Sequence, residues 1–142
     1  MKLRLKGNSL RLRLGKSEIA RLHGGGLLEE STVFGPLPSQ RLIYTLSTVS
    51  AEQEVSASFD GGRIDVRISS DVVLRWAGSE ELAVSASQTI GNEALLRILI
   101  EKDLECLDPA ARESQEDAFP HPQSGALCGG RGAPSSPEES GT

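Results

Sequence analysis

The sequence predicts a β-rich α+β protein, in which a single antiparallel sheet folds as a barrel or sandwich and carries two short helices. Three observations lead to this fold class. Apolar and polar residues alternate over many short segments, turn residues separate these segments at intervals of about 8–12 residues, and only two segments have helical spacing. Because aromatic residues make up only 4% of the chain, the core must consist mainly of Leu, Ile, Val and Ala.

The first expected element is a hairpin, or a bulged strand, over residues 3–14. Its apolar positions are odd up to Leu5 and even from Leu10 onwards. Since successive strand side chains point to opposite faces, this change of phase requires a turn or a bulge. Gly7-Asn8-Ser9 supplies the turn residues. The leucines then share one face and the cationic side chains share the other.

A short helix is expected after Gly15. Glu18 follows three residues later, as in a capping box, and Ile19 and Leu22 share one helical face. The glycine run 24–26 then ends the helix. A second helix is expected after Ser70, which we expect to cap it, and its apolar face includes Trp76 as a core anchor.

The remaining alternating segments predict strands, bringing the expected number to about seven. The clearest is a hairpin whose turn is Asp60-Gly61-Gly62. Gly91-Asn92 makes another turn before a segment so rich in aliphatic residues that we expect it to be a central strand. The predicted strands cover residues 27–34, 42–47, 54–60, 63–69, 82–86 and 94–100.

The expected compact domain covers residues 1–107. Beyond it we expect a loosely packed acidic segment over residues 108–123, attached through Phe119, and a disordered tail over residues 124–142. Proline, glycine, serine and acidic residues leave too little apolar area there to offset the entropy cost of ordering. No internal repeat of useful length is visible.

The composition predicts a cytosolic protein. No run approaches the roughly 18 apolar residues of a membrane span, so no membrane association is expected. Arg11 and Arg13 interrupt any apolar region of a signal peptide. Cys106 and Cys128 are too few for a disulfide framework, and their thiols are expected to be free. No motif indicates the oligomeric state.

Positive charge is concentrated at the N-terminus of an acidic chain. Residues 1–23 carry seven Lys and Arg residues against Glu18 alone, although the net charge of the whole chain is −5. This split indicates either an anion-binding face or internal pairing with acidic residues such as Glu101 and Asp103.

The first alternative predicts a small non-enzymatic binding or regulatory module. Its partner would be an acidic protein or the acidic end of its own domain. The predicted binding residues are Arg4, Lys6, Asn8, Arg11 and Arg13.

The motifs MKLRLKGNSLRLRLGKSE and LLRILIEKDLECL, the latter followed by an acidic stretch and FPHP, resemble a family of small bacterial proteins of unknown function. The resemblance covers most of residues 1–122. It implies a bacterial cytosolic origin and a single compact domain, and no activity is attached to it.

The segment from Lys6 to Arg13, followed by Lys16-Ser17-Glu18, is also similar to the hairpin of swapped-hairpin antitoxins and transition-state regulators. In that family two such hairpins interlock in a dimer and basic residues contact DNA. The resemblance therefore implies DNA binding as an alternative function. Here Gly15 stands where that family has a proline, and five more strands are expected. The matched positions are Lys6, Asn8, Ser9, Arg11 and Arg13.

Metal binding and catalysis are the other chemical candidates. Cys106, His121 and Cys128 are potential metal ligands, but their spacing fits no compact zinc pattern. We expect neither a metal ion nor a cofactor.

A small enzyme is the third functional alternative. It would use Cys106 as a nucleophile with His23 as its base, or a carboxylate pair among Glu101, Asp103 and Glu105. A buried thiol and ion-paired acids are the simpler interpretation. The sequence therefore predicts no catalytic residue.

Overall fold

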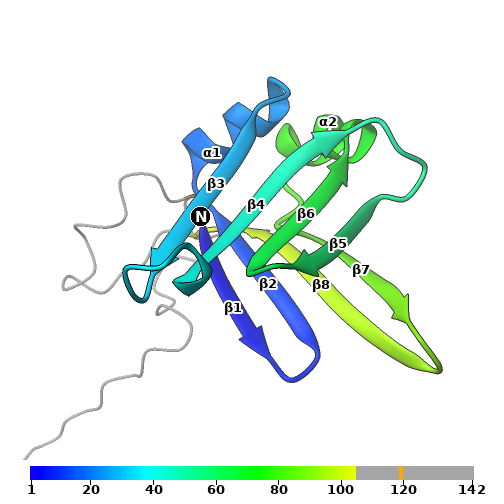
Figure 1. Ribbon diagram of the computed structural model, residues 1–142. Coiled ribbons are helices and arrows are strands. Elements are labelled where there is room, and N and C mark those ends of the chain that lie inside the picture. Colours follow the sequence, from blue (N-terminus) through cyan, green and yellow to red (C-terminus); the bar gives the residue numbers. More distant parts are fainter. Residues whose placement is uncertain (105–118, 120–142) are drawn as a thin grey trace, which may run out of the picture.

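The computed structural model describes residues 1–104 and Phe119 (Figure 1). These residues form eight strands, two α-helices and one short 3-10 helix. In chain order the elements are β1 (Lys2–Lys6), β2 (Ser9–Leu14), α1 (Lys16–His23), β3 (Leu27–Val33), η1 (Pro38–Gln40), β4 (Arg41–Val49), β5 (Val55–Asp60), β6 (Arg63–Ser69), α2 (Ser70–Ala77), β7 (Ala83–Ile90) and β8 (Ala94–Lys102).

The strands form two four-stranded sheets. Sheet A has the order β1-β2-β8-β7 and sheet B the order β3-β4-β6-β5. The prediction of a single antiparallel sheet is therefore wrong, and the described residues form no closed barrel. In each sheet the two central strands are parallel, β2 with β8 and β4 with β6. Alternation predicts a strand but not its partner, so the sequence alone did not reveal these long-range parallel pairings.

The two sheets arise because two similar halves of the chain exchange hairpins. Residues 1–49 and residues 55–102 each contain a hairpin, a helix and a second pair of antiparallel strands. The first hairpin of each half joins the sheet of the other half's second strand pair. An internal repeat thus exists in the topology, although none is visible in the sequence.

The two first hairpins have equivalent turns. Gly7 lies between β1 and β2 with a φ of 54°, and Gly61 lies between β5 and β6 with a φ of 58°. Both angles belong to the left-handed region, which glycine adopts without steric cost. Both predicted hairpins are confirmed, and the first is a true hairpin, not a bulged strand.

The two helices contact each other at one end of the sheets (Figure 1). The backbone N–H of Gly15 donates to the Glu18 carboxylate at 3.0 Å, as the predicted capping box requires. In the second helix the N-cap is Ser69, not Ser70, because the Ser69 hydroxyl accepts from the N–H of Val72 at 3.3 Å.

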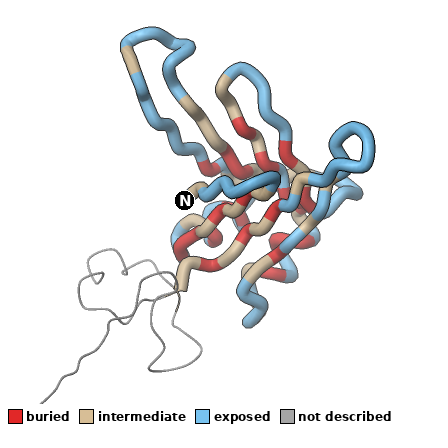
Figure 2. The backbone as a smooth tube through the Cα atoms, turned by 90° about the horizontal axis from the view of Figure 1, so that it is seen from below, coloured by how far each residue is buried: buried red, intermediate tan, exposed pale blue. Residues whose placement is uncertain are grey.

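One core receives buried side chains from both sheets and both helices (Figure 2). Trp76 is fully buried, as expected for a core anchor. Lys102 is also buried: its ammonium group donates to the carbonyl of Ser79 at 2.7 Å and lies over the Trp76 ring, 5.7 Å from the centroid. Burial lowers the pKa of Lys102, since it disfavours the charged form.

The end of the described chain returns to this core. The N–H of Phe119 donates to the carbonyl of Asp103 at 2.6 Å, and the Phe119 ring packs against the core. The other residues of the predicted segments 108–123 and 124–142 lie outside the described residues. No helix within the described part of the chain is long and apolar enough to cross a membrane.

Candidate functional site

The outer face of sheet A carries most of the N-terminal positive charge. The leucines at positions 10, 12 and 14 of β2 face the core, so the intervening arginines face outward. The antiparallel register places the cations of β1 on the same face, and the parallel register adds one from β8. We call this surface the basic face; its cationic residues are Lys2, Arg4, Lys6, Arg11, Arg13 and Arg97.

Cations stand directly opposite cations on this face. The register of β1 and β2 pairs Lys2 with Arg13 and Arg4 with Arg11. Like charges at directly opposed positions destabilise a sheet. The hairpin is therefore not arranged for electrostatic stability on its outer side.

Internal ion pairs neutralise part of the basic face. The Nε atoms of Arg11 and Arg13 lie 3.2 and 3.4 Å from the same carboxylate oxygen of Glu101. The Nζ atom of Lys2 lies 3.1 Å from Asp103. The predicted pairing of the N-terminal cations with Glu101 and Asp103 is thus present. These two carboxylates neutralise only part of the charge of the three cations that they contact.

The other three cations have no such partner. Within the described residues, no carboxylate oxygen lies within 4.0 Å of a side-chain nitrogen of Arg4, Lys6 or Arg97. The basic face therefore keeps an excess of positive charge that no described part of the protein neutralises.

Asn8 plays a structural part in this region. Its side-chain amide donates to the backbone carbonyl of Leu95. The backbone carbonyl of Asn8 accepts from the backbone N–H of Arg97 at 3.1 Å. These bonds tie the β1–β2 turn to the beginning of β8. Asn8, one of the five predicted binding residues, thus holds the β1–β2 hairpin against β8, next to the cations of the basic face.

The basic face is hollowed between Arg11 and Arg97. The hollow forms because several side chains there are short, namely those of Ser9, Ser85 and Ser87. Its volume is about 610 Å³. Sequence reasoning missed Arg97 and the two β7 serines. Arg97 interrupts the aliphatic run of β8, which was a signal, but only the pairing of β2 with β8 shows that it joins the N-terminal cations.

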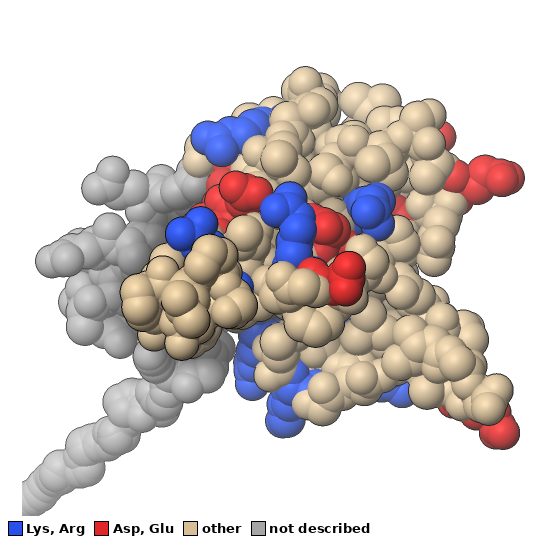
Figure 3. All heavy atoms as spheres, in the orientation of Figure 1, with Lys and Arg blue, Asp and Glu red and all other residues tan. Residues whose placement is uncertain are grey.

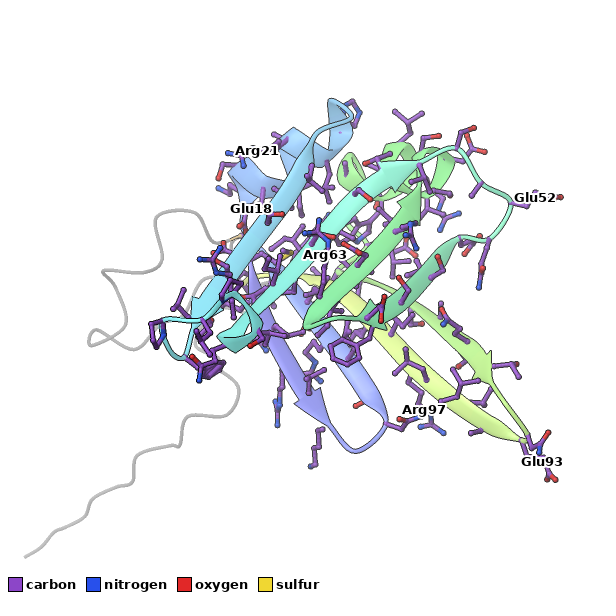
Figure 4. The ribbon with its side chains drawn as sticks, viewed as in Figure 1. Glu18, Arg21, Glu52, Arg63, Glu93 and Arg97 are labelled. Carbon is purple, nitrogen blue, oxygen red and sulfur yellow. The ribbon has the colours of Figure 1, made fainter. Side chains whose placement is uncertain are left out.

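The outer face of sheet B has a different arrangement of charge (Figures 3 and 4). Arg63, near its centre, lies 3.5 Å from Glu29 and 3.0 Å from Asp65. The Thr45 hydroxyl donates to Asp65 at 2.6 Å. That hydrogen bond, helped by Arg63, lowers the pKa of Asp65 although burial opposes the shift. Arg63, at the centre of this face, is thus matched with opposite charges, whereas Arg41 and Arg67 form no ion pair with the described residues.

The N-terminal amine is also held by acids. It pairs with the Glu18 carboxylate and lies 3.4 Å from Glu30. The Tyr44 hydroxyl donates to the carbonyl of Met1 at 3.3 Å. Burial, and then the charges of Glu30 and Glu18, raise the pKa of Tyr44. These contacts fix the start of β1 against sheet B.

A second hollow, of about 510 Å³, lies between the sheets near the hairpin turns and is mainly apolar. Its lining includes equivalent residues of the two halves, such as Leu10 and Ile64 or Leu42 and Leu96. Gln88 borders it and bonds both the N–H and the carbonyl of Ala57, each at 2.8 Å. This hollow therefore lies where the two halves meet.

The other predicted chemistry is not assembled in the described region. Among residues 1–104 and Phe119, no three metal-ligating side chains form a group. Glu101 and Asp103 form ion pairs with N-terminal cations, which is the simpler interpretation of the acidic group. Cys106, Cys128, His121 and Glu105 lie outside the described residues, so the roles considered for them stay predictions.

Comparison with known proteins places the chain in a family. No curated protein and no solved structure matches the sequence. Residues 1–123 match a family described as a family of unknown function, DUF7009. This range includes all the strands and helices of the described residues, and it agrees with the resemblance expected from the two end motifs. The chain therefore belongs to the DUF7009 family, whose function is unknown.

Proposed function

We propose that this protein is a small non-enzymatic binding module that holds an acidic protein partner on its basic face. The observation that carries the proposal is the pair of like-charge rows on the β1–β2 hairpin, Lys2 opposite Arg13 and Arg4 opposite Arg11. A strand pair selected for stability alone would place opposite charges at these positions. Local arrangements that oppose stability are typical of functional surfaces.

The distribution of neutralising groups supports the same function. Arg4, Lys6 and Arg97 have no carboxylate partner within the described residues, so a partner's acids would meet cations that are free to pair. Complementary charge of this kind steers association and fixes orientation more than it adds affinity. We therefore expect binding that is fast at low salt and weakens as salt rises.

The compartment is part of the proposal. We propose a bacterial cytosolic protein, because the two end motifs resemble a family of small bacterial proteins and the sequence has only two cysteines. We also propose that the two sheets pack as a sandwich, since their inner faces contribute to one core.

The decisive experiment compares charge reversal on the two sheets. Arg4→Glu/Lys6→Glu changes the basic face at two cations that form no ion pair with the described residues. Arg41→Glu/Arg67→Glu makes the same change in net charge on sheet B. Binding of each full-length variant to an oligoglutamate peptide is measured by fluorescence anisotropy at about 50 mM salt, where screening is incomplete.

We expect the basic-face variant to lose at least about tenfold in affinity, which corresponds to about 1.4 kcal/mol, and the sheet B variant to bind like the wild type. Circular dichroism checks that both variants are folded. Equal losses in the two variants would mean that only net charge matters, and the proposed binding face would be wrong.

DNA binding is a second candidate, favoured by one observation. Two hairpins of this chain are exchanged between its halves, which matches the interlocking that the swapped-hairpin resemblance implies for a dimer. Here one chain supplies both hairpins, so a monomer is compatible with that function. The net charge of −5 favours an acidic protein over DNA, because it repels a polyanion at long range.

Gel shifts with duplex DNA at about 50 mM salt distinguish the two candidates. For DNA binding, retardation should appear at micromolar protein and fall steeply as salt rises. Retardation that disappears in Arg4→Glu/Lys6→Glu, together with no binding of the oligoglutamate peptide, would replace the acidic-protein proposal by the DNA-binding one.

A further inference from the structure

The hollow of the basic face is surrounded by donors from three strands. Ser9, Arg97 and Ser87 are register partners and form one row across β2, β8 and β7. Arg11 and Ser85 belong to the next row, on either side of Leu99. From the spacing of strands and residues, the Cα atoms of Arg11 and Arg97 are about 8 Å apart. The two guanidinium groups therefore extend from neighbouring strands beside one hollow.

The charges around this hollow are unbalanced. Two arginines line it and no carboxylate does. Among the described residues, Arg97 (labelled in Figure 4) forms no ion pair, and Arg11 pairs with Glu101 alone, which it shares with Arg13. Glu101 can stay paired with Arg13 when Arg11 turns to a ligand. The hollow is thus suited to a group with about two negative charges.

Hydroxyl groups complete the donor set. The hydroxyls of Ser85 and Ser87 form no hydrogen bond within the part of the chain that the structure describes. The Ser9 hydroxyl is already used, since it donates to the carbonyl of Lys6 at 2.6 Å. Two guanidinium groups, each donating two hydrogen bonds, and two hydroxyls offer more hydrogen bonds than the roughly four lone-pair sites of one carboxylate accept. A phosphoryl group has three acceptor oxygens and a charge near −2, and it pairs well with arginine.

We propose that this hollow receives a phosphorylated serine or threonine side chain of the acidic partner. The inference rests on the proposed function and specifies the chemistry that the basic face recognises. At about 610 Å³ the hollow has room for residues flanking the phosphoryl group. Leu99, which also lines it, offers an apolar contact to them. Arg97 and Arg11 bind the phosphoryl oxygens, and Ser85 and Ser87 donate to them.

The test uses three acidic peptides that differ at one position, which carries phosphoserine, serine or glutamate. Fluorescence anisotropy measures their affinity for the full-length protein at fixed salt. We expect the phosphopeptide to bind about tenfold more tightly than the serine peptide, with the glutamate peptide between them.

Matched variants locate the effect. Arg97→Gln, inside the hollow, should remove the advantage of the phosphopeptide over the serine peptide. Arg4→Gln, on the same face outside the hollow, should weaken all three peptides by a similar factor and preserve the advantage. Both positions are exposed, and circular dichroism checks the fold of each variant.

The outcomes separate this inference from the proposed function. Equal affinities for the phosphoserine and serine peptides would overturn the phosphoryl site and leave the acidic-partner function standing. Absence of binding by all three peptides would overturn the proposed function and with it this inference. If inorganic phosphate competes as strongly as the phosphopeptide, the ligand is free phosphate and docking of a modified side chain is wrong. If Arg4→Gln and Arg97→Gln reduce the advantage equally, the hollow is not its site.

Discussion

The hairpins β1–β2 and β5–β6 occupy equivalent places in the two halves of the molecule, but their outer faces differ. Both turn at a left-handed glycine and both pair in parallel with a strand of the other half. On β2 the outward residues Arg11 and Arg13 share one acid, whereas on β6 Arg63 and Asp65 pair with each other. The fold therefore tolerates either charge pattern, and the proposed binding function rests on the like-charge pattern of the first hairpin.

The largest expected effect comes from the inner faces, where the two hairpins should behave alike. Leu12 and Val66 are both fully buried at equivalent positions. Leu12→Ala should lower the free energy of unfolding by about 2–5 kcal/mol, because it leaves a cavity, and Val66→Ala should cost less since it removes fewer atoms. Urea denaturation measures both values. A negligible loss in either variant would contradict the equivalence of the two halves in the core.

A smaller loss of stability is expected when a cation of the first hairpin is copied onto the second hairpin, in sheet B. Asp65→Arg gives β6 the residue that β2 carries at the equivalent position, Arg11. It removes the partner of Thr45 and of Arg63, so we expect a loss of about 1–3 kcal/mol in thermal or urea unfolding. Ser58→Arg is the control, because it adds charge to the same face without removing a bond. If the control is equally destabilised, added charge and not lost pairing is responsible.

The lowered pKa of Asp65 should also make the stability of the protein depend on pH. Thr45→Val removes the hydroxyl that lowers the pKa of Asp65, and we expect a loss of about 1 kcal/mol at pH 7. A carboxyl with a lowered folded-state pKa stabilises the protein above its ordinary value of 3.8. This contribution is lost as the pH falls through the folded-state value.

Urea unfolding of the wild type and of Thr45→Val across this pH range provides the measurement. The difference between the two proteins should shrink as Asp65 becomes protonated. A difference that stays constant with pH would show that the hydroxyl acts independently of the Asp65 charge.

The smallest effect is expected on the basic face itself. Arg4→Ser copies the residue at the equivalent position of β5, Ser58, and relieves the repulsion between Arg4 and Arg11. Stability at low salt should stay the same or rise by about 0.2–1 kcal/mol. At about 1 M salt, where charges are screened within a few ångströms, the difference should disappear. A clear loss of stability would mean that Arg4 has a structural role and would weaken the argument for a binding face.

Much of the local structure followed from nearby residues. The phase change around Gly7-Asn8-Ser9 predicted the first hairpin, Asp60-Gly61-Gly62 predicted the second, and Glu18 predicted the start of the first helix. These features depend on contacts within a few residues, which the sequence displays directly. The cations of β2 on the candidate site could be predicted for the same reason, because alternation with buried leucines forces Arg11 and Arg13 outward.

Other parts of the site could not be found in this way. Arg97, Ser85 and Ser87 join the basic face only because β8 pairs with β2 and β7 pairs with β8. Asn8 was expected at the binding surface, and the bond that it forms with the backbone at the beginning of β8 could not be predicted. Both results depend on which distant strand lies next to the hairpin.

The sequence by itself determined the strands, their turns and the side of each strand that carries charge. Only the tertiary structure decided that there are two sheets, that the halves exchange hairpins, and which cations have no acidic partner among the described residues. The physical reason is the range of the interactions. Alternation and turn chemistry act over a few residues, whereas strand pairing and ion pairing join groups brought together only when both halves bury their apolar faces in one core.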